Sequence, residues 1–258
     1  MAVQATTEKD RVRGFWEARP CGSAHAASPP GSPQFFDEVE RKRIELEPFI
    51  ARYARFEEAA GRDLLEIGVG LGTDFIRFVR AGARATGIDL TPASVDLVRR
   101  RLAVEGLQAD VRTADAEHLP FASCSFDLVY SWGVLHHTPD TARAIQEAQR
   151  VLRPGGALCV MLYGRCSWVA LGLWVRYGLL RARPWRTLSD VIAAHMESEG
   201  TKAYTRRELR EMFGGLCDLT IEHVGTPYDA RVAGPLARWT GRRLGWFMVI
   251  RGTRGPSD

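Results

Sequence analysis

The sequence predicts an α/β fold in which a mostly parallel β-sheet carries helices on both faces. Short apolar runs typical of buried strands alternate with longer stretches of helical periodicity between residues 62 and 163. Glycines, acidic residues or histidines follow several of these runs directly. In such sheets the carboxyl ends of the strands border the ligand crevice, so the sequence predicts one binding site at that edge.

Length and composition narrow the class of protein. A chain of 258 residues is long enough for one sizeable core, or for one domain with an added lid. The net charge of +4 is only mildly basic and does not predict a nucleic-acid partner. The five cysteines are scattered, without a C-x-x-C pair, which argues against a disulfide framework and against a metal site. With no apolar leader and no apolar run of about 18 residues, we expect a cytoplasmic protein.

The stretch from Leu64 to Asp74 is the strongest candidate for a ligand-binding loop. An apolar strand runs into three alternating glycines, Gly68, Gly70 and Gly72, and a helix begins after them. Glycine lets the backbone turn sharply and lets a ligand approach without a Cβ in the way. A dinucleotide-binding loop has the pattern G-x-G-x-x-G, but here the third glycine comes one residue early. The loop therefore departs from the dinucleotide pattern.

An acidic residue closes the next predicted strand, residues 85–90. Asp89 lies about twenty residues past the first glycine, where a carboxylate can accept hydrogen bonds from both hydroxyls of a ribose. The alternative is a carboxylate at a helix N-terminus, ahead of Pro92. We favour the ribose role because Asp89 belongs to the same strand edge as the glycine loop, and we include Leu90 in the candidate site.

Five motifs occur in one order over residues 62–163: L-E-I-G-V-G-L-G, G-I-D, A-D-A-E-H-L-P-F, F-D-L-V-Y-S-W-G-V-L-H-H and R-V-L-R-P-G-G. In sequence and spacing they resemble the class I S-adenosylmethionine-dependent methyltransferases of the methyltransferase-11 type. The resemblance covers roughly two fifths of the chain. It implies a Rossmann-like sheet of seven strands with the last strand antiparallel, S-adenosyl-L-methionine as cofactor and S-adenosyl-L-homocysteine as product. It barely constrains the acceptor, because function depends on the site that a fold carries.

The resemblance also implies roles for single residues. Glu66 and the glycine loop are expected to hold the amino-acid end of the cofactor. Asp115, at the end of a strand predicted for residues 109–115, matches the acid that accepts a hydrogen bond from the adenine amine, beside the small residue Ala116. A solvated turn is the alternative for this acid. Ser131, near the end of the fourth predicted strand, completes the expected cofactor-binding set.

The expected reaction is a displacement in which an acceptor atom attacks the sulfonium methyl group. Holding the acceptor and the methyl group in line supplies most of the rate in such reactions, and a base can add to it. His136 and His137 are the candidate bases because imidazole titrates near neutral pH. We expect only one of them to face the acceptor, with a slight preference for His136; capping or packing roles for both are the alternative. Tyr163, Tyr130 and His195 are weaker candidates.

The remaining segments are expected to surround a core of residues 61–163. Residues 1–60 are predicted to form a helical cap, whose aromatic side chains either touch the substrate or pack on the sheet. Residues 164–204 are predicted to form an inserted helical lid on the acceptor side, and residues 205–258 a helix and two closing strands. The aromatic residues of the cap are Phe15, Trp16, Phe35 and Phe36.

The insertion carries apolar side chains on more than one face of a predicted helix, residues 167–180. A buried lid helix is the favoured interpretation. A helix lying on a membrane surface, helped by nearby arginines, is the less favoured alternative. Five of the seven tryptophans follow the core, which predicts an apolar acceptor cleft. They are Trp168, Trp174, Trp185, Trp239 and Trp246.

Together these observations predict an enzyme that methylates an O, N or C atom of a small, aromatic or lipophilic molecule. The competing hypotheses are a nicotinamide-dependent oxidoreductase on a similar fold and a catalytically silent cofactor-binding domain. Thr73, which stands where a dinucleotide loop has its third glycine, counts against the oxidoreductase. The sequence does not determine the oligomeric state; a homodimer is one option.

Overall fold

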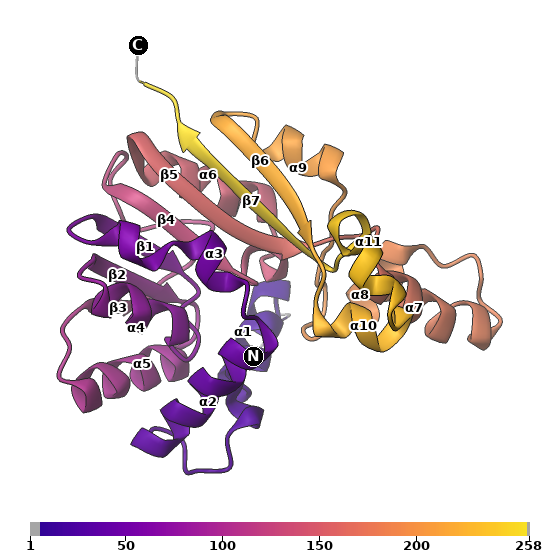
Figure 1. The fold of residues 1–258 in the computed structure, drawn as a ribbon, viewed down its shortest axis with the longest axis horizontal. Helices are drawn as coiled ribbons and strands as arrows, with labels where there is room; N and C mark the ends of the chain where they lie inside the picture. The colour runs from indigo at the N-terminus through magenta and orange to yellow at the C-terminus, as the bar shows by residue number, and fades with distance from the viewer. Residues whose placement is uncertain (1–5, 257–258) are drawn as a thin grey trace, which may run out of the picture.

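A computed structural model describes residues 6–256, with one seven-stranded β-sheet at its centre (Figure 1). The strand order is β3-β2-β1-β4-β5-β7-β6, and β7 runs antiparallel to both β5 and β6 while the other neighbours are parallel. This arrangement confirms the predicted fold class, including the antiparallel last strand. The strands are β1 (Asp63–Ile67), β2 (Arg84–Asp89), β3 (Asp110–Thr113), β4 (Phe126–Trp132), β5 (Leu152–Tyr163), β6 (Leu216–Val224) and β7 (Phe247–Arg254).

Helix boundaries follow local chemistry. Thr205 caps a helix through a capping box with Glu208, and Pro48 falls between two helices. The helices are α1 (Glu8–Ala18), α2 (Pro33–Leu46), α3 (Ile50–Ala54), α4 (Thr73–Arg80), α5 (Pro92–Glu105), α6 (Thr141–Val151), α7 (Trp168–Tyr177), α8 (Leu188–His195), α9 (Arg206–Met212), α10 (Pro227–Ala233) and α11 (Leu236–Leu244), with the 3₁₀ turns η1 (Ser23–His25), η2 (Phe56–Ala59), η3 (Leu135–His137) and η4 (Leu179–Arg181).

Two apolar cores lie on opposite faces of the sheet. Because successive side chains of a strand point to opposite faces, Leu64 packs in one core and Leu65 in the other. The first core contains side chains of α3, α4 and α5, and the second contains side chains of α6 and α9. The sheet is therefore covered on both faces, and its strand ends form a rigid edge for a site.

Four helices form a separate layer beyond the ends of β5, β6 and β7: α7, α8, α10 and α11 (Figure 1). The predicted lid helix α7 is half-buried: Ala170 is fully buried and Val169 and Leu173 pack on the first core, while Leu171 is 42% exposed. The structure also adds α10 and α11, for which the sequence predicts no element.

Candidate active site

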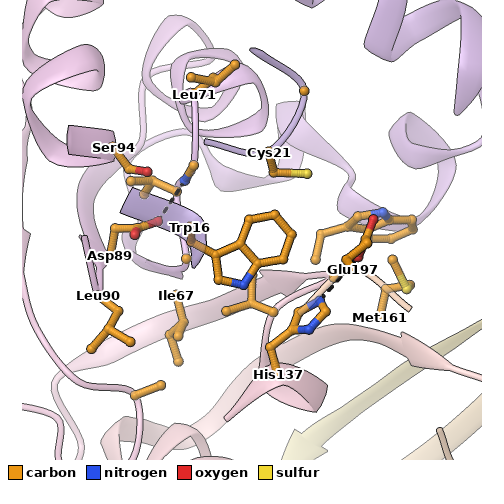
Figure 2. A pocket seen from close by; sticks show the side chains of 18 of the residues that line it. Trp16, Cys21, Ile67, Leu71, Asp89, Leu90, Ser94, His137, Met161 and Glu197 are labelled. Atoms are coloured by element: carbon orange, nitrogen blue, oxygen red, sulfur yellow. Dashed lines mark hydrogen bonds and ion pairs between the residues drawn. The ribbon is translucent and has the colours of Figure 1, made fainter. Parts of the chain in front are cut away.

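A cavity of about 400 Å³ lies at the predicted edge of the sheet (Figure 2). Figure 2 shows Asp89 and Leu90 on one side of the Trp16 indole, and His137, Glu197 and Met161 on the other. We call these the Asp89 side and the Glu197 side. The cavity walls come from the glycine loop, from the ends of β2, β4 and β5, from α1 and from the inserted helical layer.

The glycine loop depends on glycine at two positions for different reasons. Gly68 has φ +80°, and a Cβ there would lie 2.3 Å from Cγ2 of Val134. Gly70 has φ +52° and open space where a Cβ would be, so its backbone borders the cavity directly. Gly72 packs against Val98 instead and does not line the cavity, which corrects its expected contact with the ligand.

Asp89 lines the cavity and also holds the loop. Its Oδ2 accepts a hydrogen bond from the Gly70 N–H (3.0 Å), and its Oδ1 accepts from the backbone N–H and the hydroxyl of Thr91 (3.0 and 2.7 Å). Burial raises the pKa of the Asp89 carboxyl, although these bonds act to lower it. A carboxylate offers about four acceptor positions. About one position therefore remains for a ligand hydroxyl, whereas the sequence analysis expects two such bonds. Leu90 lines the same side.

Glu66 is the most unusual titratable group of the cavity wall. Its side chain is 3% exposed, and Oε2 has no hydrogen-bond partner among the described residues. Burial raises its pKa well above the ordinary value, and the nearby Asp74 carboxylate raises it further. Asp74 itself pairs with Arg43 (3.0 Å), so that arginine is already engaged. An unpartnered buried carboxyl beside a bare glycine backbone fits a ligand that brings its own positive charge.

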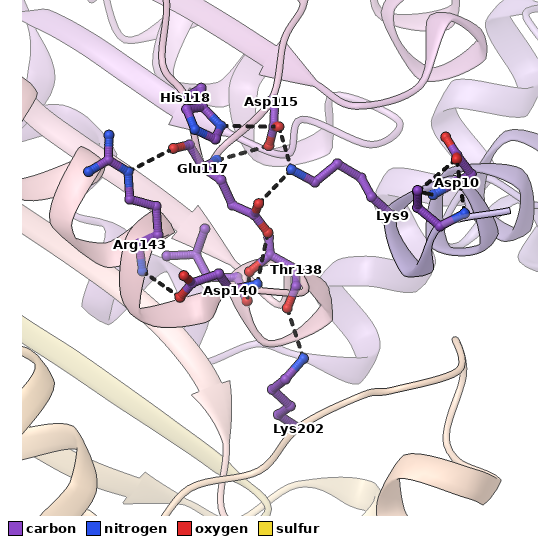
Figure 3. Close-up of polar contacts among 11 residues, drawn as sticks. Lys9, Asp10, Asp115, Glu117, His118, Thr138, Asp140, Arg143 and Lys202 are labelled. Carbon is purple, nitrogen blue, oxygen red and sulfur yellow. Dashed lines mark hydrogen bonds and ion pairs between the residues drawn. The ribbon is translucent and has the colours of Figure 1, made fainter. Parts of the chain in front are cut away.

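Asp115 and its neighbours form an ion-pair cluster at the mouth of the Asp89 side (Figure 3). Lys9 of α1 donates to Asp115 Oδ2 at 2.6 Å and also to Glu117. Burial acts to raise the pKa of Asp115, but the bond from Lys9 and a backbone bond from Glu117 lower it below the usual value. Asp115, Glu117 and His118 could hold a metal ion by spacing alone, but the Lys9 ammonium occupies the place between the two carboxylates. Ala116 lines the cavity beside them, as expected.

Of the two adjacent histidines, only His137 lines the cavity. His136 is fully buried behind the cavity wall, its ring centroid lies 3.9 Å from that of Tyr163, and burial lowers its pKa well below the ordinary value. His137 lines the cavity, and its Nε2 lies 3.5 Å from Oε2 of Glu197. The slight preference for His136 was therefore wrong, because the turn η3 directs only His137 toward the ligand space.

Glu197 is the functional candidate that the sequence analysis missed. It follows α8 in the insertion, and its carboxylate accepts a hydrogen bond from the Tyr163 hydroxyl at 3.0 Å. Burial acts to raise its pKa, but bonds from His137 and Tyr163 outweigh that effect and lower it. On the opposite ring nitrogen, Nδ1 of His137 lies 2.9 Å from the Ser198 hydroxyl. No motif marks Glu197, because its partner lies 60 residues earlier in the chain.

Two other expectations need correction. Ser131 is fully buried, and its hydroxyl donates to the backbone carbonyl of Ile67, so it supports β1 from behind instead of facing a ligand. Of the five late tryptophans only Trp246 lines the cavity, since Trp185 and Trp239 are 75% and 86% exposed. Among the cap aromatics only Trp16 lines it, while Phe35 and Phe36 pack in a small core of their own. The aromatic walls are Trp16, Trp132, Tyr163, Tyr228, Trp246 and Phe247.

Comparisons with known proteins agree with this geometry. Residues 65–160 match the family model described as a methyltransferase domain. The chain is similar to the 27-O-demethylrifamycin SV methyltransferase of Amycolatopsis mediterranei, with 40% identity over 39% of this chain and 38% of that one. It is likewise similar to the phthiotriol/phenolphthiotriol dimycocerosates methyltransferase of Mycobacterium leprae, with 40% identity over 47% of this chain and 44% of that one.

Among solved structures, the [4+2]-cyclase SpnF superposes with a TM-score of 0.63 at 18% identity, covering 98% of both chains, which shows a shared fold. For two other curated relatives, the matched stretch covers 40% and 62% of the relative's own length, which is less than two thirds in each case. The motifs, the sheet topology and the family match agree with one another, and residues 65–160 form a methyltransferase domain of the class I S-adenosylmethionine-dependent type.

Proposed function

We propose that this chain transfers a methyl group from S-adenosylmethionine to a small lipophilic molecule. The observation that carries the proposal is the division of one cavity into two chemically different sides. The Asp89 side combines bare glycine backbone with carboxylates, and the Glu197 side combines aromatic walls with a histidine–carboxylate pair. When bound, the cofactor supplies an electrophilic methyl group on a positively charged sulfur.

The residues of the Asp89 side bind and orient. Glu66 holds the positively charged amino-acid end of the cofactor, since its Oε2 lacks a hydrogen-bond partner within residues 6–256. Asp89 accepts a hydrogen bond from a ribose hydroxyl with its remaining acceptor position, while its other bonds keep the Gly70 backbone in place. Asp115 and Ala116 border the adenine, with Lys9 closing the site from α1.

The residues of the Glu197 side position the acceptor and remove its proton. Aromatic rings from β4, β5, β7 and α1 provide flat apolar walls. His137 and Glu197 form the polar contact within these walls. The pair takes the acceptor's proton, and the Tyr163 hydroxyl helps to hold Glu197 toward His137. Two relatives are named for rifamycin and phthiotriol acceptors, and this supports a lipophilic natural product as the substrate class.

The test is methyl transfer from radiolabelled S-adenosylmethionine to a panel of aromatic and lipophilic alcohols, phenols and amines. With a working acceptor, Glu197→Gln is expected to lower kcat by roughly 10²- to 10⁴-fold, because a positioned base contributes about that factor. The affinity for S-adenosylhomocysteine should not change. Glu199→Gln is the matched control, since its carboxylate is 67% exposed and pairs with Arg11 outside the cavity.

Two outcomes contradict the proposal. Binding of NADH without binding of S-adenosylhomocysteine, measured by calorimetry, supports the oxidoreductase instead. Tight S-adenosylhomocysteine binding with no methyl transfer to any acceptor of the panel supports a catalytically silent domain.

A further inference from the structure

The inserted helical layer leaves many large apolar side chains in water. Of the nine exposed large hydrophobic residues among those described, seven lie in residues 168–186 and 227–244. Leu180 and Trp185 are each 75% exposed and Trp239 is 86% exposed. Single exposed apolar residues are ordinary, but a gathering of seven in one layer is typical of an interaction surface. The other four are Leu171, Leu179, Val232 and Leu236.

The same two segments are strongly and uniformly basic. They contain eight arginines and a single acid, Asp229, which is fully buried. Among the described residues, none of the eight arginines forms an ion pair with a carboxylate. These eight charges exceed the net charge of the whole chain, +4, so the rest of the chain is net negative. The arginines are Arg176, Arg181, Arg183, Arg186, Arg231, Arg238, Arg242 and Arg243.

The two segments form one continuous surface, which we call the apolar–basic face. α7 contacts η4 and α10, and α10 contacts α11 (Figure 1). The approach of α7 and α10 is close, because a Cβ on Gly172 would lie 2.9 Å from Val232. A shallow groove lies along this contact, lined by Trp168, Leu171, Val175, Leu180 and Val232 beside Arg176.

We propose that the apolar–basic face docks on the surface of a membrane that contains anionic phospholipids. Tryptophan favours the headgroup region, leucine side chains enter the acyl boundary, and arginine pairs with lipid phosphates. None of the described helices is long and apolar enough to cross a bilayer, and this mode of binding requires only that a face lies on it. The less favoured interpretation of the sequence thus becomes the favoured one, since Leu171 of α7 and Leu179 and Leu180 of η4 are exposed.

Charge and chemistry favour a lipid surface over two other partners. A symmetric contact with a second copy would bring eight unpaired arginines against eight others, which is unfavourable without acids to separate them. Single-stranded nucleic acid uses aromatic rings to stack bases, but five of the seven exposed apolar residues are aliphatic and offer no ring for stacking. An acyl chain can contact all seven.

The face also adjoins the acceptor side of the cavity. α7 contributes Val169 to the cavity wall, and α10 contributes Tyr228. If the proposed methyl transfer is correct, a lipophilic acceptor dissolved in the bilayer reaches the Glu197 side through the layer that touches the membrane. The docking proposal itself does not depend on that reaction.

The experiment is co-sedimentation of the full chain with vesicles of phosphatidylcholine alone and of phosphatidylcholine with phosphatidylglycerol. Binding is expected to the anionic vesicles and should weaken as salt rises. Arg181→Gln with Arg183→Gln should weaken it roughly 30-fold, since each basic residue near such a surface contributes about a factor of five. Trp185→Ser with Trp239→Ser should weaken it roughly tenfold or more, through lost apolar burial.

Matched control variants lie outside the face. Ile44→Ser with Val104→Ser removes two side chains that are 46% and 48% exposed, and Arg62→Gln with Arg100→Gln removes two exposed arginines. Both controls should bind vesicles as the unmodified chain does. Calorimetry with S-adenosylhomocysteine on every variant checks folding and is independent of docking.

Several results overturn the docking proposal: no sedimentation with anionic vesicles, equal binding to neutral ones, or equal losses in the control variants. Self-association, or retention of single-stranded RNA or of an acidic protein in place of vesicles, that disappears with the same substitutions also overturns it. Failure of vesicle binding with intact S-adenosylhomocysteine binding leaves the proposed function standing. Vesicle binding without any binding of S-adenosylhomocysteine contradicts the proposed function and leaves the docking proposal standing.

Discussion

Replacing Glu66 with glutamine tests the cofactor site through two opposite effects. Glutamine keeps the shape of the side chain but cannot ionise. In the cavity wall Glu66 is 3% exposed, and its Oε2 has no hydrogen-bond partner in the part of the chain that the structure describes. A buried carboxylate without partners costs stability, so Glu66→Gln is expected to raise the free energy of unfolding by about 1–3 kcal/mol at neutral pH. The same change removes the negative charge that we assign to the positively charged end of the cofactor.

The pH dependence follows from the sign of the pKa shift. Burial raises the pKa of Glu66 well above 4.5, so the folded protein retains a proton that the unfolded chain releases. The stability contributed by this group is fully present below pH 4.5 and is lost as pH rises toward the folded-state pKa. The advantage of the glutamine variant should therefore be absent at low pH and should grow as pH rises.

Binding should change in the other direction. A charge-assisted hydrogen bond is worth about 1.5–3 kcal/mol, so Glu66→Gln should weaken S-adenosylhomocysteine binding roughly 10- to 150-fold. Binding of a cation favours the ionised carboxyl, so the unmodified chain should release a proton as it binds. Calorimetry in buffers of different ionisation enthalpy measures that release, and the variant should show none of it.

Glu147→Gln is a control that should change the free energy of unfolding in the opposite direction. This carboxylate pairs with Arg150 and accepts a bond from the Leu119 N–H, so its loss should lower stability and leave binding unchanged. Unaltered affinity and unaltered proton release in Glu66→Gln would remove Glu66 from the cofactor site. If Glu66→Gln lowered the free energy of unfolding at pH 8, the Glu66 carboxyl would have a partner in the folded protein.

The other predictions concern the glycine loop and helix α1 at the cavity mouth. Gly68→Ala should lower the free energy of unfolding by more than the roughly 1–2 kcal/mol that a left-handed non-glycine residue costs, because the new Cβ meets the methyl groups of Val134 at 2.3 and 2.5 Å. Gly82→Ala, with φ +88° and open space around the new Cβ, should lower it by only that amount. Chemical denaturation measures both, and equal losses would contradict the clash. Lys9→Met should speed S-adenosylhomocysteine dissociation in stopped flow, because α1 loses its bonds to Asp115 and Glu117. Lys42→Met, which removes an exposed ion pair within α2, should leave the dissociation rate unchanged. Equal rates in both variants and the unmodified chain would mean that the contacts of α1 do not slow the release of S-adenosylhomocysteine.

Local patterns were enough to predict the core of the fold. The strand ending at Ile67, the glycine turn and the helix that follows all depend on neighbouring residues, and the parallel sheet with helices on both faces follows from the alternation of strands and helices. The capping box of Thr205 and Glu208 is likewise a short-range signal.

The candidate site was only partly predictable, because its acceptor side is built from distant parts of the chain. Which of two adjacent histidines faces a cavity depends on the turn η3, and periodicity gives no information about a turn of three residues. Glu197 and Lys9 have no local signal, since each acquires its role from a partner in another segment. The sequence predicts a buried α7 and the structure has it half-buried, because hydrophobicity alone does not say how much of a helix other elements cover.

The antiparallel strand β7 has a consequence for biosynthesis. It lies between β5 and β6, yet it is made last of the seven. During translation β5 must therefore wait with an unpaired edge while more than 80 residues emerge before Phe247 can pair with Tyr163. A frameshift or nick near the end of the gene would remove an interior strand, and we expect such products to aggregate instead of accumulating as shortened enzymes.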